Sequence, residues 1–274
     1  MYPVLFSIGG IQVHSYYVLW TFALCCGVAW ARRRMGILYG MEDDQARRIL
    51  LVVFLGMLAG ARVGGMMGTW EIYRTEPMKL LRFWEGALSA VPAFLGAGVA
   101  GILSCRRHGV PVWKVADAGS IPAAFVVAFG RWGCFLNGCC SGKGTSLPWG
   151  VRFPGDPLGL ARHPVQLYYA LSALFILGIL QRIEARFLSV GEDRRIQGAV
   201  LWPLFMIFYS LVRLFLDPFR EEFGDVGLQE VRILSGAVLA SGAAWLLHSL
   251  FFRKKEGVRQ GNAEREIRKK NDAS

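Results

Sequence analysis

The chain has 274 residues, of which 54% are hydrophobic and 19% are charged, and its formal net charge is +11. Soluble chains carry about 25% charged residues, so this composition excludes an ordinary soluble domain. Apolar stretches of about twenty residues recur along the chain, and this is the length at which a helix crosses a bilayer. The sequence therefore predicts an all-α, polytopic membrane bundle.

About seven apolar segments are expected to span the membrane. In chain order they cover residues 14–31, 49–69, 86–104, 115–134, 165–181, 197–216 and 233–252. No Lys or Arg precedes the first apolar run and no small-residue cleavage pattern is present, so this segment is expected to stay as a span. Residues 1–252 are interpreted as one transmembrane domain, and residues 253–274 as a basic cytoplasmic tail that we expect to be disordered.

The distribution of positive charge predicts the orientation of the spans. Of the 31 Lys and Arg residues, twenty fall in one set of loops and the tail, and nine fall on the opposite side. Because cytoplasmic loops collect positive charge, we expect the N-terminus outside and the C-terminus in the cytoplasm. The basic tail would then lie against anionic membrane lipids, which accounts for the net charge without nucleic acid.

Charged and aromatic polar residues gather at the expected outer ends of the spans. Arg62 lies near the end of the second span and Arg131 at the end of the fourth. Four more residues lie on one stripe at the end of the sixth span: Tyr209, Arg213, Asp217 and Arg220. Any one arginine is equally explained as an interfacial anchor, and Arg213 with Asp217 as a structural i,i+4 pair. Several arginines together favour a phosphate site, because guanidinium groups bind phosphate in bidentate fashion.

Two pairs of residues open other spans on the same side. His14 and Tyr16 open the first span, and His163 and Gln166 open the fifth. A loop histidine bonded to the backbone explains His163 as well as a chemical role does. The sequence has no Gly-x-Ser-x-Gly elbow and no P-loop. A phospholipid headgroup is the natural phosphate at this depth, so the pattern predicts a lipid-handling site.

Three cysteines form a Cys-x4-Cys-Cys motif at the end of the fourth span. They are Cys134, Cys139 and Cys140. This is not a standard zinc spacing, and no histidine is close in sequence. A disulfide between Cys134 and Cys139 is sterically conceivable, whereas one between adjacent cysteines would be strained. Packing or a structural disulfide is favoured over thiol or metal chemistry, and we expect no resident metal or other cofactor.

The segment 130–138, Gly-Arg-Trp-Gly-Cys-Phe-Leu-Asn-Gly, resembles the signature of the bacterial prolipoprotein diacylglyceryl transferase family. Other blocks match in the same order. They are a tyrosine at the mouth of the first span (14–16), Gly-x-Arg-x-Gly (60–64), Arg-His-Pro-x-Gln-Leu-Tyr (162–168), and a Tyr, Arg, acid and Arg block (209–220). The resemblance extends over residues 3–250, and the family's seven-span, N-out arrangement agrees with the charge count.

The resemblance implies a specific activity in the bacterial cytoplasmic (inner) membrane. Such enzymes transfer the diacylglyceryl group of phosphatidylglycerol to the lipobox cysteine thiol of a preprolipoprotein and release glycerol phosphate. By resemblance, the catalytic residues are Arg131, Arg213, Tyr209 and His163. Those implied to bind substrate are Arg131, Arg62, Tyr16, Asn137, Gly142, Gln166 and Arg220.

Four departures from the family pattern leave alternatives open. Cys134 replaces an asparagine, Cys139 a glutamate, and Tyr169 an acid, while Val91 stands where the family has a histidine. His14, His163 or a thiolate from Cys134 or Cys139 is a hypothetical substitute base. One alternative is a lipid-binding relative without catalysis or with altered specificity. The other is a thiol or metal membrane protein that uses the three cysteines.

Overall fold

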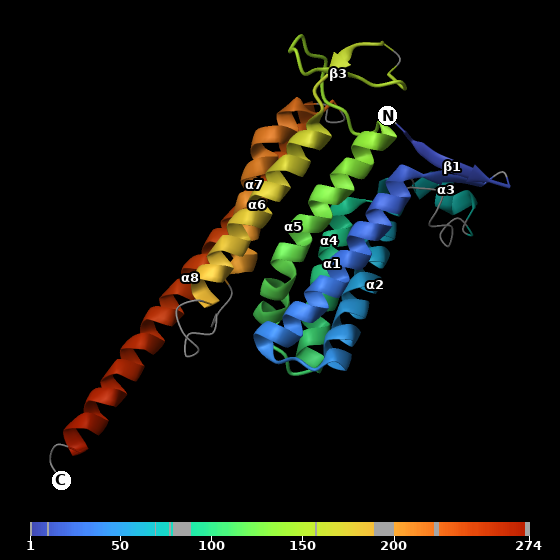
Figure 1. The fold of residues 1–274 in the computed structure, drawn as a ribbon. Helices are drawn as coiled ribbons and strands as arrows, with labels where there is room; N and C mark the ends of the chain where they lie inside the picture. The colour runs from blue at the N-terminus through green and yellow to red at the C-terminus, as the bar shows by residue number, and fades with distance from the viewer. Residues whose placement is uncertain are drawn as a thin grey trace. The chain divides into compact units, whose positions relative to one another are not determined.

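The computed structural model describes residues 2–9, 11–68, 70–76, 78, 89–156, 158–188, 200–221 and 225–271. Its helices, shown in Figure 1, are α1 (Ser15–Tyr39), α2 (Asp43–Gly68), α3 (Trp70–Thr75), α4 (Ala90–Arg107), α5 (Val112–Asn137), α6 (Val165–Leu188), α7 (Leu201–Leu216) and α8 (Asp225–Asn271). A 3-10 turn, η4 (Asp217–Phe219), follows α7 directly.

The predicted class, a helical membrane bundle, is confirmed. Five helical stretches of the described chain are long and apolar enough to cross a membrane: Asp43–Met67, Val112–Asn137, Val165–Arg186, Leu201–Phe219 and Leu228–Phe251. The first and third expected spans overlap α1 and α4, although residues 86–88, and residues 197–199 of the sixth expected span, lie outside the described residues. The total of seven spans and their orientation stay predictions.

Two short antiparallel strand pairs depart from a purely helical fold. β1 (Val4–Ile8) pairs with β2 (Ile11–His14) ahead of α1, and β3 (Val151–Arg152) pairs with β4 (Ala161–Arg162) between α5 and α6. Gly9, at φ +55°, lies between two short apolar runs, which is a hairpin signal in the sequence. Both pairs lie before or between the long helices, where the backbone must find partners outside a helix.

The backbone groups into two compact units, and the boundaries fall inside α1 and α5. One unit contains residues 1–29 and 119–274, and the other contains residues 30–118. The backbone of α8 continues as a helix to Asn271, through the basic segment. A transmembrane domain over residues 1–252 with a separate tail stays a prediction.

In the unit of residues 30–118, α2 and α4 cross at glycine. A Cβ atom on Gly60 would lie 2.1 Å from the carbonyl oxygen of Pro92, and one on Gly56 would lie 2.3 Å from Cβ of Ala100. Small residues four apart let two helix backbones approach this closely. Pro92 lies in the first turn of α4, where its missing N–H leaves no hydrogen bond unmade. The Val91-Pro92-Ala93 segment is therefore part of the helix crossing.

In the other unit, the first half of α1 packs on α5. A Cβ atom on Gly130 would lie 2.6 Å from the indole ring of Trp20, and Phe22 contacts Phe129 edge to face. α7 packs against both α6 and α8. The loop between α5 and α6, which carries β3 and β4, extends beyond the ends of these two helices (Figure 1). This packing brings the C-terminal end of α5 beside the start of α6 and the end of α7.

Candidate functional site

Two arginines flank a buried tyrosine–aspartate pair where α5, α6 and α7 meet. The Cζ atom of Arg131 lies 4.6 Å from the ring centroid of Tyr169. The Tyr169 hydroxyl donates a hydrogen bond to one carboxylate oxygen of Asp217. The Nε of Arg213 donates to the other oxygen at 3.0 Å. Tyr169 and Asp217 are each 1% exposed, so these four residues form one connected cluster, which we call the arginine cluster.

The arginine cluster follows from helical spacing. Arg213 and Asp217 are four residues apart at the end of α7, so their side chains lie on one face. Tyr209 lies one turn before Arg213 and stacks on Phe205, with ring centroids 5.7 Å apart. Tyr209 is also close enough to both Arg131 and Arg213 to interact with them electrostatically. An arginine over an aromatic ring contributes about 0.5–2 kcal/mol, depending on how far it is desolvated.

Both guanidinium groups keep donors for a ligand. Arg213 donates a hydrogen bond to Asp217 through Nε, and the guanidinium of Arg131 lies over the face of the Tyr169 ring. In the described chain, the Nη groups of Arg213 and the N–H groups of Arg131 donate to no protein acceptor. A guanidinium carries five N–H donors in a planar fork, which matches the oxygens of a phosphate. The arrangement can therefore bind an anionic phosphate ester.

Gln166 lies next to this cluster and holds the chain after α5. Its side chain is fully buried, and its Nε2 donates to the carbonyl oxygen of Cys139 at 2.7 Å. Its Oε1 accepts no hydrogen bond from any described residue. Buried amide oxygens are normally paired, so this acceptor is available to a donor that a ligand would bring.

The three predicted cysteines also meet here. The Sγ atoms of Cys134, Cys139 and Cys140 all lie within 4.8 Å of one another. Cys134 is buried and the other two are partly buried, and none of the three forms a disulfide in the described chain. The sequence spacing gave little reason to expect a three-sulfur cluster, because the turn that closes it is not visible in the spacing.

His163 belongs to the loop beyond the helices. Its Nδ1 lies 3.3 Å from the hydroxyl of Tyr168, which also accepts a hydrogen bond from Nε1 of Trp149 at 2.8 Å. Its ring packs edge to face on Phe219, with centroids 5.2 Å apart. Among the described contacts of His163, none joins it to the two arginines of the arginine cluster. Its role in chemistry stays a prediction.

Gly142 is fixed between the loop and the ends of α6 and η4. Its N–H donates to the carbonyl of His163 at 2.9 Å, and it forms a bridge with Arg220. A Cβ atom there would lie 2.6 Å from Cγ2 of Val165 and 2.7 Å from the carbonyl oxygen of Phe219. The backbone carbonyl cannot rotate away as a side chain can. Only glycine fits at this position.

Gly142→Ala is therefore expected to destabilise the protein by about 1–3 kcal/mol, the usual effect of overpacking. Gly144→Ala is the matched control, because a Cβ atom at Gly144 would meet its nearest neighbour at 3.7 Å, an ordinary contact. Thermal unfolding of both variants in detergent measures the difference. Equal melting temperatures for the two variants would contradict this account.

A buried ion pair holds the loop together. Arg162 donates to Asp156 at 2.6 Å and to Glu221, and both Asp156 and Arg162 have side chains less than 10% exposed. Asp156 also accepts the N–H of Leu160 at 2.8 Å. The hydrogen bond from Arg162 is the largest cause that lowers the pKa of the Asp156 carboxyl below its usual value. The carboxylate in turn raises the pKa of Arg162.

The loop is expected to lose stability in acid. Because folding lowers the pKa of Asp156, its contribution is present above the unfolded value of 3.8 and is lost as the pH falls through the lower, folded value. Hydrogen exchange of residues 143–162, measured from neutral pH downward, checks this. Asp156→Asn should exchange faster than the wild type near neutral pH, and the two should converge below about pH 4. A constant difference between them would contradict the assignment.

Three more predicted site residues lie in the same unit. Tyr16 is in the first turn of α1, where its ring contacts Tyr17 and Trp20 with centroids 5.4 and 6.2 Å apart. Asn137 is the last residue of α5 and is partly buried. Arg220 is buried. Its backbone N–H donates to the backbone carbonyl of Asp217 at 3.0 Å, which places it beside the arginine cluster.

Arg62 lies in the unit of residues 30–118. Its side chain is 4% exposed, and its Cζ lies 5.2 Å from the ring centroid of Tyr73 in α3. The sequence assigned no site role to Tyr169, a departure from the family pattern, or to Asp217, a member of the stripe with Arg213, although the structure places both in the arginine cluster. Cys140 had a role only in the thiol or metal alternative. The sequence did contain a signal for Tyr169 and Asp217. Because a tyrosine stands at position 169 where the family has an acid, Asp217 is the carboxylate that remains near the arginines.

Comparison with known proteins identifies the family of the chain. The family model described as "Prolipoprotein diacylglyceryl transferase" matches residues 3–249. A "Phosphatidylglycerol--prolipoprotein diacylglyceryl transferase" of Geobacter sulfurreducens is 31% identical over 230 residues, which cover 82% of this chain and 85% of that protein. Proteins of the same name from a Wolbachia strain of Drosophila simulans (29%, covering 87% and 89%) and from Rhizobium leguminosarum (31%, covering 82% and 81%) are similar to the chain. The chain belongs to the prolipoprotein diacylglyceryl transferase family.

Proposed function

We propose that this protein transfers the diacylglyceryl group of phosphatidylglycerol to the lipobox cysteine thiol of a preprolipoprotein, with release of glycerol phosphate. Its family and the names of its relatives support a diacylglyceryl transferase that acts on prolipoprotein. The observation that carries the proposal is the arginine cluster. Two guanidinium groups with unused donors lie on either side of one buried tyrosine–aspartate pair.

The reaction requires stabilisation of charge on a departing phosphate. The acceptor sulfur forms a bond to a glycerol carbon of the donor lipid, and the bond from that carbon to the phosphate oxygen breaks. The electron pair leaves with the phosphate, so negative charge grows on its oxygens. Arg131 and Arg213 would stabilise that charge with preorganised N–H donors, and the buried Asp217 holds Arg213 in place.

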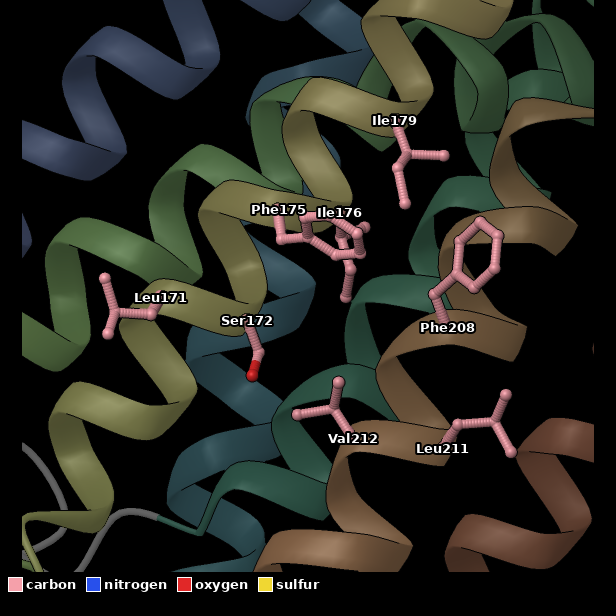
Figure 2. A pocket seen from close by; sticks show the side chains of 8 residues that line it. All are labelled: Leu171, Ser172, Phe175, Ile176, Ile179, Phe208, Leu211 and Val212. Carbon is pink, nitrogen blue, oxygen red and sulfur yellow. The ribbon is translucent and has the colours of Figure 1, made fainter.

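An apolar groove beside the arginine cluster fits the acyl part of the donor. It has a volume of about 430 Å³ and lies between α6 and α7. Figure 2 shows Leu171 and Phe175 on one side and Phe208 and Leu211 on the other, with Ser172 as the polar side chain. Phe208 is the residue before Tyr209 in α7. A lipid whose phosphate is held by Arg213 would therefore have an apolar surface for its chains on the same two helices.

The charge distribution supports the membrane arrangement of the site. We place seven spans in the bacterial cytoplasmic membrane, with the N-terminus outside and the basic C-terminal segment at the cytoplasmic surface. In this arrangement the C-terminal ends of α5 and α7 and the start of α6 face the outer leaflet side. The arginine cluster and residues 138–164 then meet a preprolipoprotein whose lipobox cysteine has crossed the membrane.

A direct assay tests the proposal. The full chain is purified in detergent and mixed with phosphatidylglycerol and a peptide that carries a lipobox cysteine. We expect release of glycerol phosphate and an increase in peptide mass equal to one diacylglyceryl group. The same peptide with serine in place of cysteine should stay unmodified. A folded protein that binds phosphatidylglycerol and modifies no peptide would contradict the proposed activity.

A further inference from the structure

The cluster of Cys134, Cys139 and Cys140 is built by a defined turn. α5 ends at Asn137, and Gly138 follows in the left-handed region with φ +75°. The N–H of Cys139 donates to the carbonyl of Cys134 at 3.2 Å, and the N–H of Gly138 donates to that of Phe135 at 3.1 Å. These two bonds form a Schellman motif, which turns the chain back over the last turn of a helix. The turn places the fifth residue after Cys134 directly beside it.

The third sulfur is held by an unusual backbone conformation. Cys140 has φ +62°, and it is a non-glycine residue with positive φ. Such conformations cost energy and gather at functional sites. The side chain of the buried Gln166 fixes the carbonyl of Cys139 at 2.7 Å. The three thiols are thus positioned by the protein and do not meet by chance on a mobile segment.

The spacing of the sulfur atoms suits a metal ion better than a disulfide. Three thiolates bound to one Zn²⁺ at about 2.3 Å each lie just under ~4 Å apart. The three sulfur atoms here all lie within 4.8 Å of one another. A disulfide needs the sulfur atoms at about 2.05 Å, would leave one thiol over, and would be strained between neighbours in sequence. A single metal ion uses all three thiols with a small movement.

The surroundings favour a negatively charged complex. Arg131 lies one turn before Cys134 in α5 and is close enough to interact electrostatically with Cys134 and Cys140. Three thiolates and one divalent cation carry a net charge of −1, which the guanidinium offsets. Three protein ligands also leave one tetrahedral position open, as in catalytic rather than structural zinc sites.

We propose that Cys134, Cys139 and Cys140 bind one thiophilic divalent cation, with Zn²⁺ as the reference ion, and that its open position receives the acceptor thiol. This role rests on the proposed function. Binding of the ion releases the three thiol protons, and the acceptor thiol loses its proton to solvent when it coordinates. The bound thiolate attacks the glycerol carbon, the carbon–oxygen bond to the phosphate breaks, and the electron pair leaves with glycerol phosphate. The thioether product is a weak ligand and dissociates.

Such a site would activate the acceptor thiol in a chain that has no histidine at position 91, where the family pattern has one. Val91, in the first turn of α4, has no proton to exchange. The described side-chain contacts of His163 are with Tyr168 of α6 and with Phe219 of η4. A cation that holds a thiol in its deprotonated form needs no separate base, because the nucleophile is already the thiolate.

Binding is tested first, on the full chain in detergent under reducing conditions. Co²⁺ is added as a spectroscopic probe and then displaced with Zn²⁺. We expect one ion per chain and a sulfur-to-cobalt charge-transfer band. With Zn²⁺ bound, Cys134, Cys139 and Cys140 should be protected from alkylation, while Cys25 and Cys26 should react as in the metal-free protein. This readout by peptide mass needs no variant.

Variants then confirm the ligands. The triple variant Cys134→Ser, Cys139→Ser, Cys140→Ser should lose the band, and Cys25→Ser with Cys26→Ser should keep it. Absence of the band and of protection in the wild type would overturn the site. A second outcome would also overturn the site. In it, the chain purified without reductant is two hydrogens lighter because one of these cysteines is disulfide-bonded, and the reduced chain binds no Co²⁺.

The transfer assay separates this inference from the proposed function. Removal of the ion by a chelator, verified by the loss of bound metal, should lower transfer about 10²-fold, the low end of what activation of a nucleophile contributes, and Zn²⁺ should restore it. Full transfer by the metal-free protein would overturn the role of the ion and leave the proposed function standing. Bound ion with no transfer in any metal state would instead contradict the proposed function.

Discussion

Arg131→Ala is expected to lower diacylglyceryl transfer by about 10²–10³-fold, the loss seen when one preorganised donor to a developing negative charge is removed. In the structure this guanidinium lies over the Tyr169 ring and donates to no protein acceptor among the described residues. Its N–H groups are therefore available to the phosphate. Glycerol phosphate release and the mass change of a lipobox peptide measure the loss.

Two substitutions make this prediction specific. Arg152→Ala removes the same charge from an exposed position in β3, and it should keep full transfer. Arg131→Lys keeps a positive charge but not the planar fork, so it should fall between the wild type and alanine. Normal transfer by a folded Arg131→Ala protein would remove Arg131 from the site. A loss as large in Arg152→Ala would show that the assay reports overall charge.

The long helices were predictable because each needs only local information. An apolar run of about twenty residues reports a span directly, and the apolar runs at 115–134 and 165–181 lie inside α5 and α6. The hairpin of β1 and β2 was not predicted, although two glycines between short apolar runs are a signal for it. Short strands carry little periodicity, so they are easily absorbed into a neighbouring element.

The arginines of the site were predictable and their arrangement was not. A charged residue at the end of an apolar run is conspicuous, which singled out Arg131 and Arg213. Tyr169 was noted only as a departure from a family pattern, because a tyrosine near a span end is ordinary. Its position between Arg131 and Asp217 depends on how α5, α6 and α7 pack. Tyr169 is 38 residues from Arg131 and 48 residues from Asp217, so no local sequence pattern predicts these contacts.

The arrangement of the three cysteines was also not predictable from their spacing in the sequence. Their spacing in the sequence matches no common zinc motif, so packing was favoured. The deciding feature is the left-handed residue Gly138, which folds Cys139 back onto Cys134. A Schellman turn at the end of a helix converts a spacing of five residues into direct proximity. Cys-x4-Cys with glycine before the second cysteine, at a helix end, is therefore a pattern that predicts neighbouring thiols.

Asp217→Ala is expected to destabilise the protein by about 3–5 kcal/mol, the range for removing one partner of a buried ion pair. Asp217 is 1% exposed, and it accepts hydrogen bonds from the Tyr169 hydroxyl and from Nε of Arg213. Without the carboxylate, a partly buried guanidinium and a buried hydroxyl lose their acceptor. Unfolding of the detergent-solubilised protein by added SDS measures the change.

The chain provides a matched control in Asp44, which pairs with Arg48 at 2.8 Å with the same four-residue spacing on α2. Both partners are about two-thirds exposed, so Asp44→Ala should cost no more than about 0.5 kcal/mol.

Tyr169→Phe, which keeps the ring under Arg131 and removes only the hydroxyl, should cost about 1.5–3 kcal/mol, typical of a hydrogen bond to a charged group. Burial places Asp217→Ala and Tyr169→Phe above Asp44→Ala, and Asp217→Ala comes first because it removes a charge that two buried or partly buried partners need. If Asp217→Ala unfolds no more readily than Asp44→Ala, the buried pair does not hold α6 and α7 together, and Arg213 must be positioned by its neighbours in α7.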